Sequence, residues 1–467
     1  MPFSKKISAL ISLLIRAVKG EQADITGGPI DRVIVLLAVP MILEMMMESL
    51  FAVVDIFFVS RVGVNAVAVV GITESLLTIV YSLGWGLAMG VTAIVARRVG
   101  EKNTEAAAVA AVQSIYVAVS IAVLISVTGI FYSEEILRLM GTPEEVITEG
   151  RGFTKIMLGG NFVIMLLFLI NGIFRGAGNA ALAMRSLWLA NIINIILDPL
   201  FIFGIGPFPE LGVEGAAVAT TIGRGAGVIY QLYHLFKGKG LIKIHADNWH
   251  VDWSIIKSII SVSAGGTGQF IIASASWIFM MRIISQFGSV ALAGYTIAIR
   301  VIVFTILPAW GMANAAATMV GQNLGAQQPA RAEKAVWRTG FFNMIFMGTV
   351  MIVFLLFSKS IVSFFTGVPE VISYAANCLT IISLGYIFYS YGMIIAQSFN
   401  GAGDTRTPTI LNFFGFWVVQ IPLAYLLANT FSFGASGVFW AIVISESSLT
   451  IAALIIFKRG RWKLKKI

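Results

Sequence analysis

Two short stretches of the chain repeat each other: FRGAGNA at Phe174–Ala180 and FNGAGDT at Phe399–Thr405. Their first residues are 225 positions apart (399 − 174 = 225). The same offset separates WGLAMGVTAIVARRVG, which ends at Gly100, from WGMANAAATMVGQNLG, which ends at Gly325. A constant offset between such distant segments indicates that the chain is an internal duplication of one unit.

The duplication also decides how the longer stretch FNGAGDTRTP is interpreted. A Gly-rich phosphate loop, a catalytic aspartate and a turn that ends a helix are all compatible with it alone. In the first copy Asn179 stands where the second copy has Asp404, and a catalytic group is not expected twice in equivalent positions. We therefore expect a tight elbow in each copy, with glycine ending one helix and Asn179 or Asp404 capping the next.

The composition of the 467 residues indicates a membrane protein. The chain is 58% hydrophobic and only 12% charged, whereas soluble domains contain about 25% charged residues. Twelve apolar segments are long enough to cross a bilayer, and they should be helices because lipid cannot satisfy backbone polar groups. They lie near 31–59, 65–95, 106–131, 150–174, 181–205, 212–235, 257–286, 290–321, 335–358, 371–399, 409–430 and 434–457.

Basic residues concentrate on one side of these predicted spans. By the positive-inside rule that side is cytoplasmic, and the chain crosses the cell membrane twelve times with both termini inside. The net charge of +9 is thus a topology signal, and no nucleic-acid partner is expected. The residues on the cytoplasmic side include Lys19, Arg32, Arg97, Arg98, Lys102, Arg175, Arg185, Lys237, Lys243, Lys257, Arg331, Lys334, Arg338 and Arg406.

The duplication and the spans together predict the domain organisation. Each copy has six spans, so both copies have the same orientation and are related by an axis along the membrane normal. We expect two pseudo-symmetric six-helix bundles, the N-lobe and the C-lobe, joined by a cytoplasmic linker. The predicted parts are an amphipathic segment on the membrane surface (1–29), the N-lobe (30–236), the linker (237–256), the C-lobe (257–458) and a basic cytoplasmic tail (459–467).

Six motifs in order along the chain resemble those of the multidrug and toxic compound extrusion (MATE) family. They are VVDIFFVSRVG, FRGAGNA, NIILDPLFIFG, GVEGAAVAT, VGQNLGA and FNGAGDTRTP. The resemblance implies a V-shaped transporter that works by alternating access. It would export small amphipathic, often cationic, organic compounds in exchange for H⁺ or Na⁺, as a monomer in the bilayer. No enzymatic activity and no cofactor beyond the coupling cation are expected.

The first predicted span carries three acidic residues on one face: Glu44, Glu48 and Asp55. Spacings of 7 and 11 residues bring them to within about 40° on a helix. A charge at mid-bilayer costs at least about 2.5–3.5 kcal/mol, so these carboxyls indicate function. Close, buried carboxyls can exchange protons near neutral pH. Alternatively, Glu44 and Glu48 simply face a hydrated cytoplasmic vestibule.

A second polar group lies on the fifth span, where Asn194 and Asp198 share a helix face. Pro199 follows and can free a carbonyl oxygen, and Thr220 of the sixth span can add a hydroxyl. These are hard oxygen ligands suited to Na⁺, or a polar site for H⁺. The motifs VVDIFF and NIILDP resemble the DinF-like branch of the family, which implies a cation site at Asp55, Asn194, Asp198 and Thr220. Hydrogen bonding between helices is the alternative for Asn194 and Thr220.

The C-lobe lacks this acidic set, because Met280 is the repeat partner of Asp55 and Gln269 is that of Glu44. We therefore place cation coupling in the N-lobe, at Asp55, Asp198, Asn194, Thr220 and Glu48. Residues expected to line the substrate cavity are Glu44, Glu48, Met47, Gln269 and Met280, and helix bends are expected at Pro40 and Pro199.

The remaining membrane charges are candidates for ion pairs with one another: Glu74, Arg224, Arg282, Arg300 and Glu446. The segment HADNWH in the linker is expected to be a solvated loop rather than a metal site. A lipid-linked oligosaccharide flippase is the alternative function, although such proteins need a basic cavity. An intramembrane aspartyl protease is disfavoured because the ninth span has no aspartate.

Overall fold

The computed structural model describes residues 3–22, 24–238 and 240–467, and these residues form helices and no strand. The predicted all-α fold class is therefore confirmed. The helices are α1 (Phe3–Val18), α2 (Ile30–Val59), α3 (Val64–Gly100), α4 (Thr104–Leu139), α5 (Glu144–Gly159), α6 (Asn161–Gly176), α7 (Ala180–Phe203), α8 (Val213–Phe236), η1 (Ala246–Trp249), α9 (Trp253–Ser285), α10 (Ser289–Gly325), α11 (Pro329–Ser363), α12 (Pro369–Ser383), α13 (Tyr386–Gly401), α14 (Arg406–Asn412), η2 (Phe413–Gln420), α15 (Ile421–Tyr425), η3 (Leu426–Thr430), α16 (Ala435–Lys458) and η4 (Arg461–Leu464).

Most of the predicted spans are recovered as long apolar helices. Ten helices or continuous helix groups of the described residues are long and apolar enough to cross a membrane, and the pair α12–α13 makes an eleventh. Helix α8 is more polar and falls short of that measure, yet it packs lengthwise against α7 as the twelfth crossing.

Spans ten and eleven are not the uniform helices that hydropathy suggested. Span ten is bent by 60° between α12 and α13, at Leu384 and Gly385. Span eleven is wound as a π-helix over η2 and η3, on both sides of Pro422, a form often found where a helix is interrupted. In contrast, Pro40 and Pro199, the predicted bends, both lie inside continuous helices.

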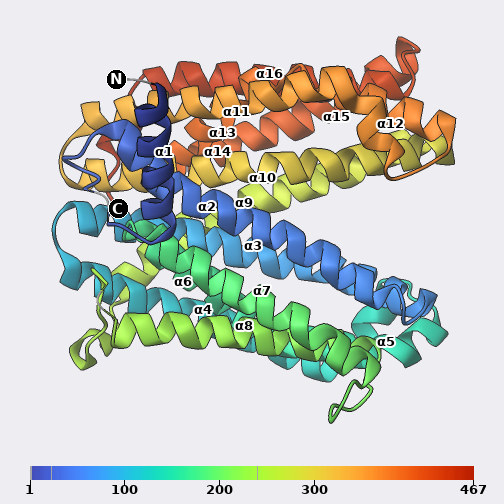
Figure 1. The fold of residues 1–467 in the computed structure, drawn as a ribbon, viewed down its shortest axis with the longest axis horizontal. Helices are drawn as coiled ribbons and strands as arrows, with labels where there is room; N and C mark the ends of the chain where they lie inside the picture. Colours follow the sequence, from blue (N-terminus) through green and yellow to red (C-terminus); the bar gives the residue numbers. More distant parts are fainter. Residues whose placement is uncertain (1–2, 23, 239) are drawn as a thin grey trace.

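The helices form two layers that run along the long axis of the molecule (Figure 1). Helices α3–α8 make up one layer and α10–α16 the other, and each layer has its own hydrophobic core. Both chain termini lie at one end, which we call the terminal end; α5 and α12 lie at the opposite end, the far end.

The first helix of each repeat crosses to the other layer. The first half of α2 packs on α10, and Val33, Ile34 and Met41 belong to the core of the C-lobe. Its repeat partner α9 packs on α3, and Ile256 and Ile259 belong to the core of the N-lobe. The lobes therefore exchange one half-helix each at the terminal end.

Glycines of the repeated motifs allow the lobes to touch there. A Cβ on Gly86 would lie 2.5 Å from the amide nitrogen of Thr267, and one on Gly311 would lie 2.7 Å from that of Ile42. These two contacts are repeat-equivalent, since Gly86 and Gly311, like Ile42 and Thr267, are 225 residues apart. The pseudo-twofold relation predicted from the motifs is thus present in space.

Both predicted elbows are tight turns, as expected. Gly178 and Gly403 each adopt a left-handed conformation with φ of +82°. The Asn179 side chain accepts a hydrogen bond from the Leu182 amide and caps α7. The prediction was wrong for Asp404, which accepts a hydrogen bond from the Thr407 hydroxyl instead of capping the helix backbone.

The linker segment HADNWH is largely exposed, as expected for a solvated loop, since five of its six residues are exposed and Asn248 is buried; it also contacts α4. Asn248 donates to Glu105, Gln113 donates to the His250 carbonyl, and Tyr116 donates to that of Trp249. All three partners lie on α4. No cluster of metal-ligating side chains occurs in the described part of the chain, which excludes residue 239 of the linker.

The tail, residues 459–467, also departs from a free basic segment. Trp462 is buried and stacks on Phe457 at a centroid distance of 4.8 Å. Beyond it the tail reaches the N-lobe, where Arg97 donates to the Lys465 carbonyl (2.9 Å) and Arg98 donates to that of Ile467 (3.2 Å). The tail therefore connects both lobes at the terminal end.

Candidate functional site

The predicted acidic face of α2 points into the N-lobe, and its innermost member, Glu44, is fully enclosed. Glu44 is 1% exposed and forms an ion pair with Arg175 of α6 at 3.3 Å. Asn171 donates a second hydrogen bond to the same carboxylate oxygen at 3.0 Å. Glu44 is therefore enclosed by its partners in this structure, and Arg175 lies in the last turn of α6.

The C-lobe has an uncharged counterpart of this ion pair at the equivalent positions. Gln269 and Asn400 donate hydrogen bonds to each other's side-chain oxygens at 3.0 and 3.1 Å. They stand 225 residues after Glu44 and Arg175 respectively. Gln269 is buried in this amide pair, with 7% of its surface exposed.

Glu48, one turn after Glu44, pairs with a different helix. Its carboxylate lies 3.2 Å from Nη2 of Arg224 on α8. The Glu48 side chain keeps 22% of its surface exposed, whereas that of Arg224 keeps 2%. Arg224 was expected to pair within the group Glu74, Arg282, Arg300 and Glu446; its actual partner is Glu48.

The predicted oxygen-ligand group comes together between α7 and α8. The Asn194 amide nitrogen donates to Asp198 Oδ1 at 3.2 Å and to Thr220 Oγ1 at 3.1 Å. Asp198 Oδ2 and Asn194 Oδ1 are buried without any hydrogen-bond partner among the described residues. Buried oxygens without donors are costly for the protein alone, and a bound cation would satisfy them. The donor set fits H⁺ or Na⁺.

Asp55 completes this group from α2. It is half-buried on α2, which packs along α7, the helix that carries Asp198. Glu74 of α3, which the sequence did not place in the site, is a further carboxyl of the N-lobe and is exposed. The N-lobe thus carries three carboxyls that form no ion pair among the described residues: Asp55, Glu74 and Asp198.

An aromatic cluster, which sequence reasoning missed, lies where the lobes meet. Trp85 of α3 stacks on Tyr81 at 5.9 Å and contacts Phe270 of α9 at 5.2 Å. Phe270 in turn contacts Trp310 of α10 at 5.6 Å. Trp85 is 40% exposed. The repeated dipeptide Trp-Gly could have revealed this aromatic cluster. Trp85 and Trp310 each directly precede a glycine, Gly86 or Gly311, that lies in the contact between the lobes.

The two methionines predicted to line the substrate cavity are in packed regions. Met280 is 1% exposed and belongs to the C-lobe core, and Met47 is 8% exposed. Neither side chain is exposed to a cavity in this structure. Met side chains in membrane helices fill gaps in the packing, and that is their observed role here. Of the predicted cavity residues Glu48 is the most exposed, with 22% of its side-chain surface accessible.

The other membrane charges do not form ion pairs with one another in the described structure. Arg300 is exposed and Glu446 is half-buried near Tyr389. Arg282 lines a cavity of about 510 Å³ between α9 and α15, together with Phe279 and Tyr425.

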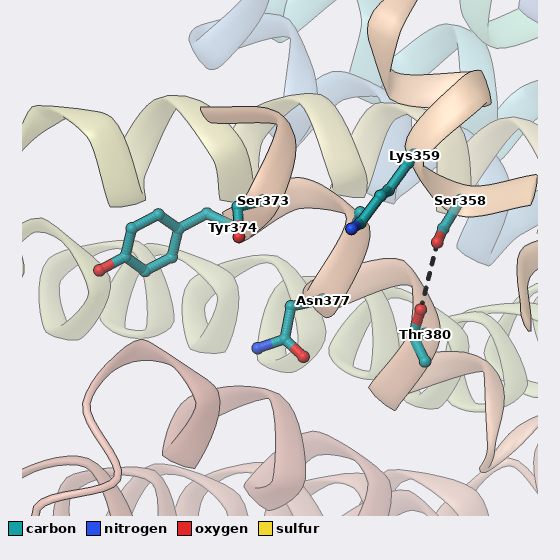
Figure 2. Close-up of a pocket in the computed structure, with 7 residues that line it drawn as sticks. Ser358, Lys359, Ser373, Tyr374, Asn377 and Thr380 are labelled. Atoms are coloured by element: carbon teal, nitrogen blue, oxygen red, sulfur yellow. Dashed lines mark hydrogen bonds between the residues drawn. The ribbon is translucent and has the colours of Figure 1, made fainter. Parts of the chain in front are cut away.

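A polar pocket of about 370 Å³ opens on the C-lobe between α11 and α12. Figure 2 shows Ser358, Lys359 and Asn377 on its wall, with a hydrogen bond of 3.3 Å from Thr380 to Ser358. It lies at the far end and shares no residue with the N-lobe carboxyls. We therefore do not assign the candidate site to it.

Comparison with known protein families gives two matches on this chain to one family model, MatE, at residues 40–200 and 267–426. The two matched segments correspond to the two repeats. Curated relatives align over nearly the whole chain. They include the probable multidrug resistance protein NorM of Thermotoga maritima (26% identity, 94% of each chain) and the FAD transporter of Shewanella oneidensis (25% identity, 93% of this chain and 95% of the relative).

Solved structures show the same architecture. One is a MOP superfamily transporter from Pyrococcus furiosus, for which the reverse polarity of the binding pocket suggests a different function. It superposes with a TM-score of 0.88 at 26% identity, covering 96% of this chain and 99% of that one. An outward-facing conformation of a multidrug resistance MATE family transporter superposes with a TM-score of 0.89, covering 95% and 98%. The likeness extends over both lobes.

Proposed function

Since the chain belongs to the MatE family of membrane transporters, we propose that it is a secondary antiporter that exports amphipathic organic cations. The observation that supports it most is the pair of buried, unpartnered oxygens on Asp198 and Asn194 beside Asp55. Such a group in a membrane protein has to bind a cation or a proton to be stable. We infer that H⁺ or Na⁺ binds there and drives export.

The lobe contacts support alternating access. The close approaches at Gly86 and Gly311 lie in the halves of α3 and α10 nearer the terminal end. The positive-inside distribution supports a cytoplasmic location for that end. We infer that the structure is closed to the cytoplasm, so that export requires these glycine contacts to separate.

The substrate class follows from the lining of the inter-lobe region. Trp85, Phe270 and Trp310 present flat π-faces at the meeting point of the lobes, and such faces attract organic cations. The unpaired charges nearby are carboxyls. A lipid-linked pyrophosphate, the substrate of a flippase, would be repelled by them, so we favour lipophilic cations.

Uptake of a fluorescent cation such as ethidium into inverted vesicles tests this function. H⁺ and Na⁺ gradients are applied separately. We expect the wild type to accumulate ethidium with one of the two gradients, and the double variant Asp55→Asn/Asp198→Asn to lose this gradient-driven uptake. Glu446→Gln, which removes a half-buried carboxyl from the C-lobe, is the matched control and should retain it. Equal uptake by wild type and the double variant would refute the proposed coupling site.

A further inference from the structure

Arg224 is an unusual residue for the interior of a membrane-spanning lobe. It lies on α8, is 1% exposed, and its guanidinium carbon faces three rings, with centroid distances of 5.1 Å to Phe51, 5.9 Å to Tyr81 and 5.5 Å to Phe168. Burying a guanidinium is costly unless charges and hydrogen-bond acceptors surround it. We therefore expect a buried arginine at this position to have a function.

The ion pair with Glu48 leaves most of that guanidinium unused. Only Nη2 donates to Glu48 Oε1, while Nε and Nη1 of Arg224 are buried without acceptors in the described structure. Glu48 Oε2 is equally without a donor. A guanidinium carries five N–H donors in a planar fork that can hold two carboxylates. Arg224 therefore has free capacity for a second acidic partner.

The acidic partners within its electrostatic reach belong to the proposed coupling site. Arg224 contacts Glu48 and the ring of Phe51 on α2, and Asp55 lies one turn beyond Phe51 on the same face of that helix. Arg224 also stands four residues after Thr220 on α8, so the two side chains leave one face of that helix. Tyr81 is the remaining titratable group that faces it.

We propose that the guanidinium of Arg224 is a fixed positive charge that competes with the coupling cation for the carboxylate of Asp55. This inference rests on the proposed function. When H⁺ or Na⁺ occupies the site, Arg224 is held by Glu48. When the cation leaves, the free donors of Arg224 compensate the charge of Asp55. The balance between Glu48 and Asp55 as partners of Arg224 then sets how readily the cation is released.

Two variants should shift the cation affinity in opposite directions. Glu48→Gln releases Arg224 toward Asp55, so the half-saturating cation concentration for transport should rise at least about threefold. Glu48→Gln/Arg224→Gln removes the competitor without leaving an unpaired charge, so that concentration should fall at least about threefold, because a nearby positive charge weakens cation binding to a carboxylate. Both are measured as ethidium export from proteoliposomes, with H⁺ and Na⁺ varied separately.

The ion pair Glu44–Arg175 supplies the control. Glu44→Gln/Arg175→Asn removes an equivalent pair farther from Asp55 and should leave the half-saturating concentration within twofold of the wild type. Unchanged cation affinity in Glu48→Gln, or shifts of both Glu48 variants in the same direction, would overturn the role of Arg224. Failure of the coupling site itself would appear separately, as cation-dependent transport that survives in Asp55→Asn.

Discussion

The pairing of Glu44 with Arg175 is the residue-level feature that the duplication explains best. The same positions of the C-lobe hold Gln269 and Asn400, an uncharged pair with similar geometry. In each version the two side chains pair with each other, so a combination of one member from each version should be less stable than either complete pair. A charge left without its partner inside a protein typically costs about 3–5 kcal/mol.

We predict that Glu44→Gln alone lowers the free energy of unfolding by about 3 kcal/mol, because Arg175 stays buried and charged. The double variant Glu44→Gln/Arg175→Asn copies the C-lobe pair and should recover most of that loss. Thermal denaturation of the detergent-purified protein measures both. A double variant no more stable than the single one would show that the two pairs are not equivalent.

The sequence indicated which residues form the candidate site, but it did not indicate which residues form ion pairs with its acidic members. Asp55, Asn194, Asp198 and Thr220 were identified from spacing and resemblance, since a membrane charge is informative by itself. The ion-pair partner of Glu48 was not predicted, because Arg224 is 176 residues away in the sequence and hydropathy does not report contacts between distant residues. The pairing of Glu44 with Arg175 could have been predicted, because both residues are replaced by amides in the second repeat.

At the scale of the helices, the contact between the lobes depends on glycine at two equivalent positions. Gly86 of α3 faces Thr267 of α9, and Gly311 of α10 faces Ile42 of α2, at distances that exclude a side chain. In each case the obstacle includes backbone atoms, so rotation of a side chain cannot relieve it. A larger residue must push the helices apart.

We predict that Gly86→Val shifts the protein toward conformations that are open at the terminal end. Spin labels at the exposed residues Thr104 and Ala330, one on each lobe, should move apart in double electron–electron resonance measurements. Gly71→Val on the same helix is the control, because a Cβ at Gly71 meets open space. A distance distribution for Gly86→Val that matches this control would contradict the prediction.

The tail depends on a single anchor in the same region. Trp462 is 1% exposed, and truncating a buried Trp to Ala costs about 3–5 kcal/mol. We predict that Trp462→Ala releases the tail from Arg97 and raises amide hydrogen exchange over residues 461–467 and 97–100. Leu464→Ala, at a position 81% exposed, should leave exchange unchanged. Equal protection in both variants would mean that Trp462 does not hold the tail.

Hydropathy and the repeat predicted the helices well but not their packing. Length and apolar content determine which segments cross the membrane, and ten of the predicted spans were recovered from these alone. The crossing of α2 and α9 to the opposite lobes depends on which faces are complementary, which periodicity does not reveal. The 60° bend between α12 and α13 depends likewise on packing against neighbouring helices.

The whole molecule is a duplicated scaffold, and we propose that its N-lobe carries the cation-coupling chemistry. Both lobes contribute equivalent helices and equivalent glycine contacts to the interface. The unpaired carboxyls Asp55, Glu74 and Asp198 are in the N-lobe, while the equivalent of Asp55 is the core residue Met280. The central claim is that the N-lobe binds the coupling cation and that both lobes move.

Release of the coupling cation on addition of substrate tests this claim most directly. The purified protein is mixed with ethidium while released protons are followed with a pH dye, or released ²²Na⁺ is counted. We predict release from the wild type and from Glu446→Gln, and none from Asp198→Asn. Release from Asp198→Asn at the wild-type level, together with its loss in Glu446→Gln, would place the coupling site in the C-lobe and contradict the claim.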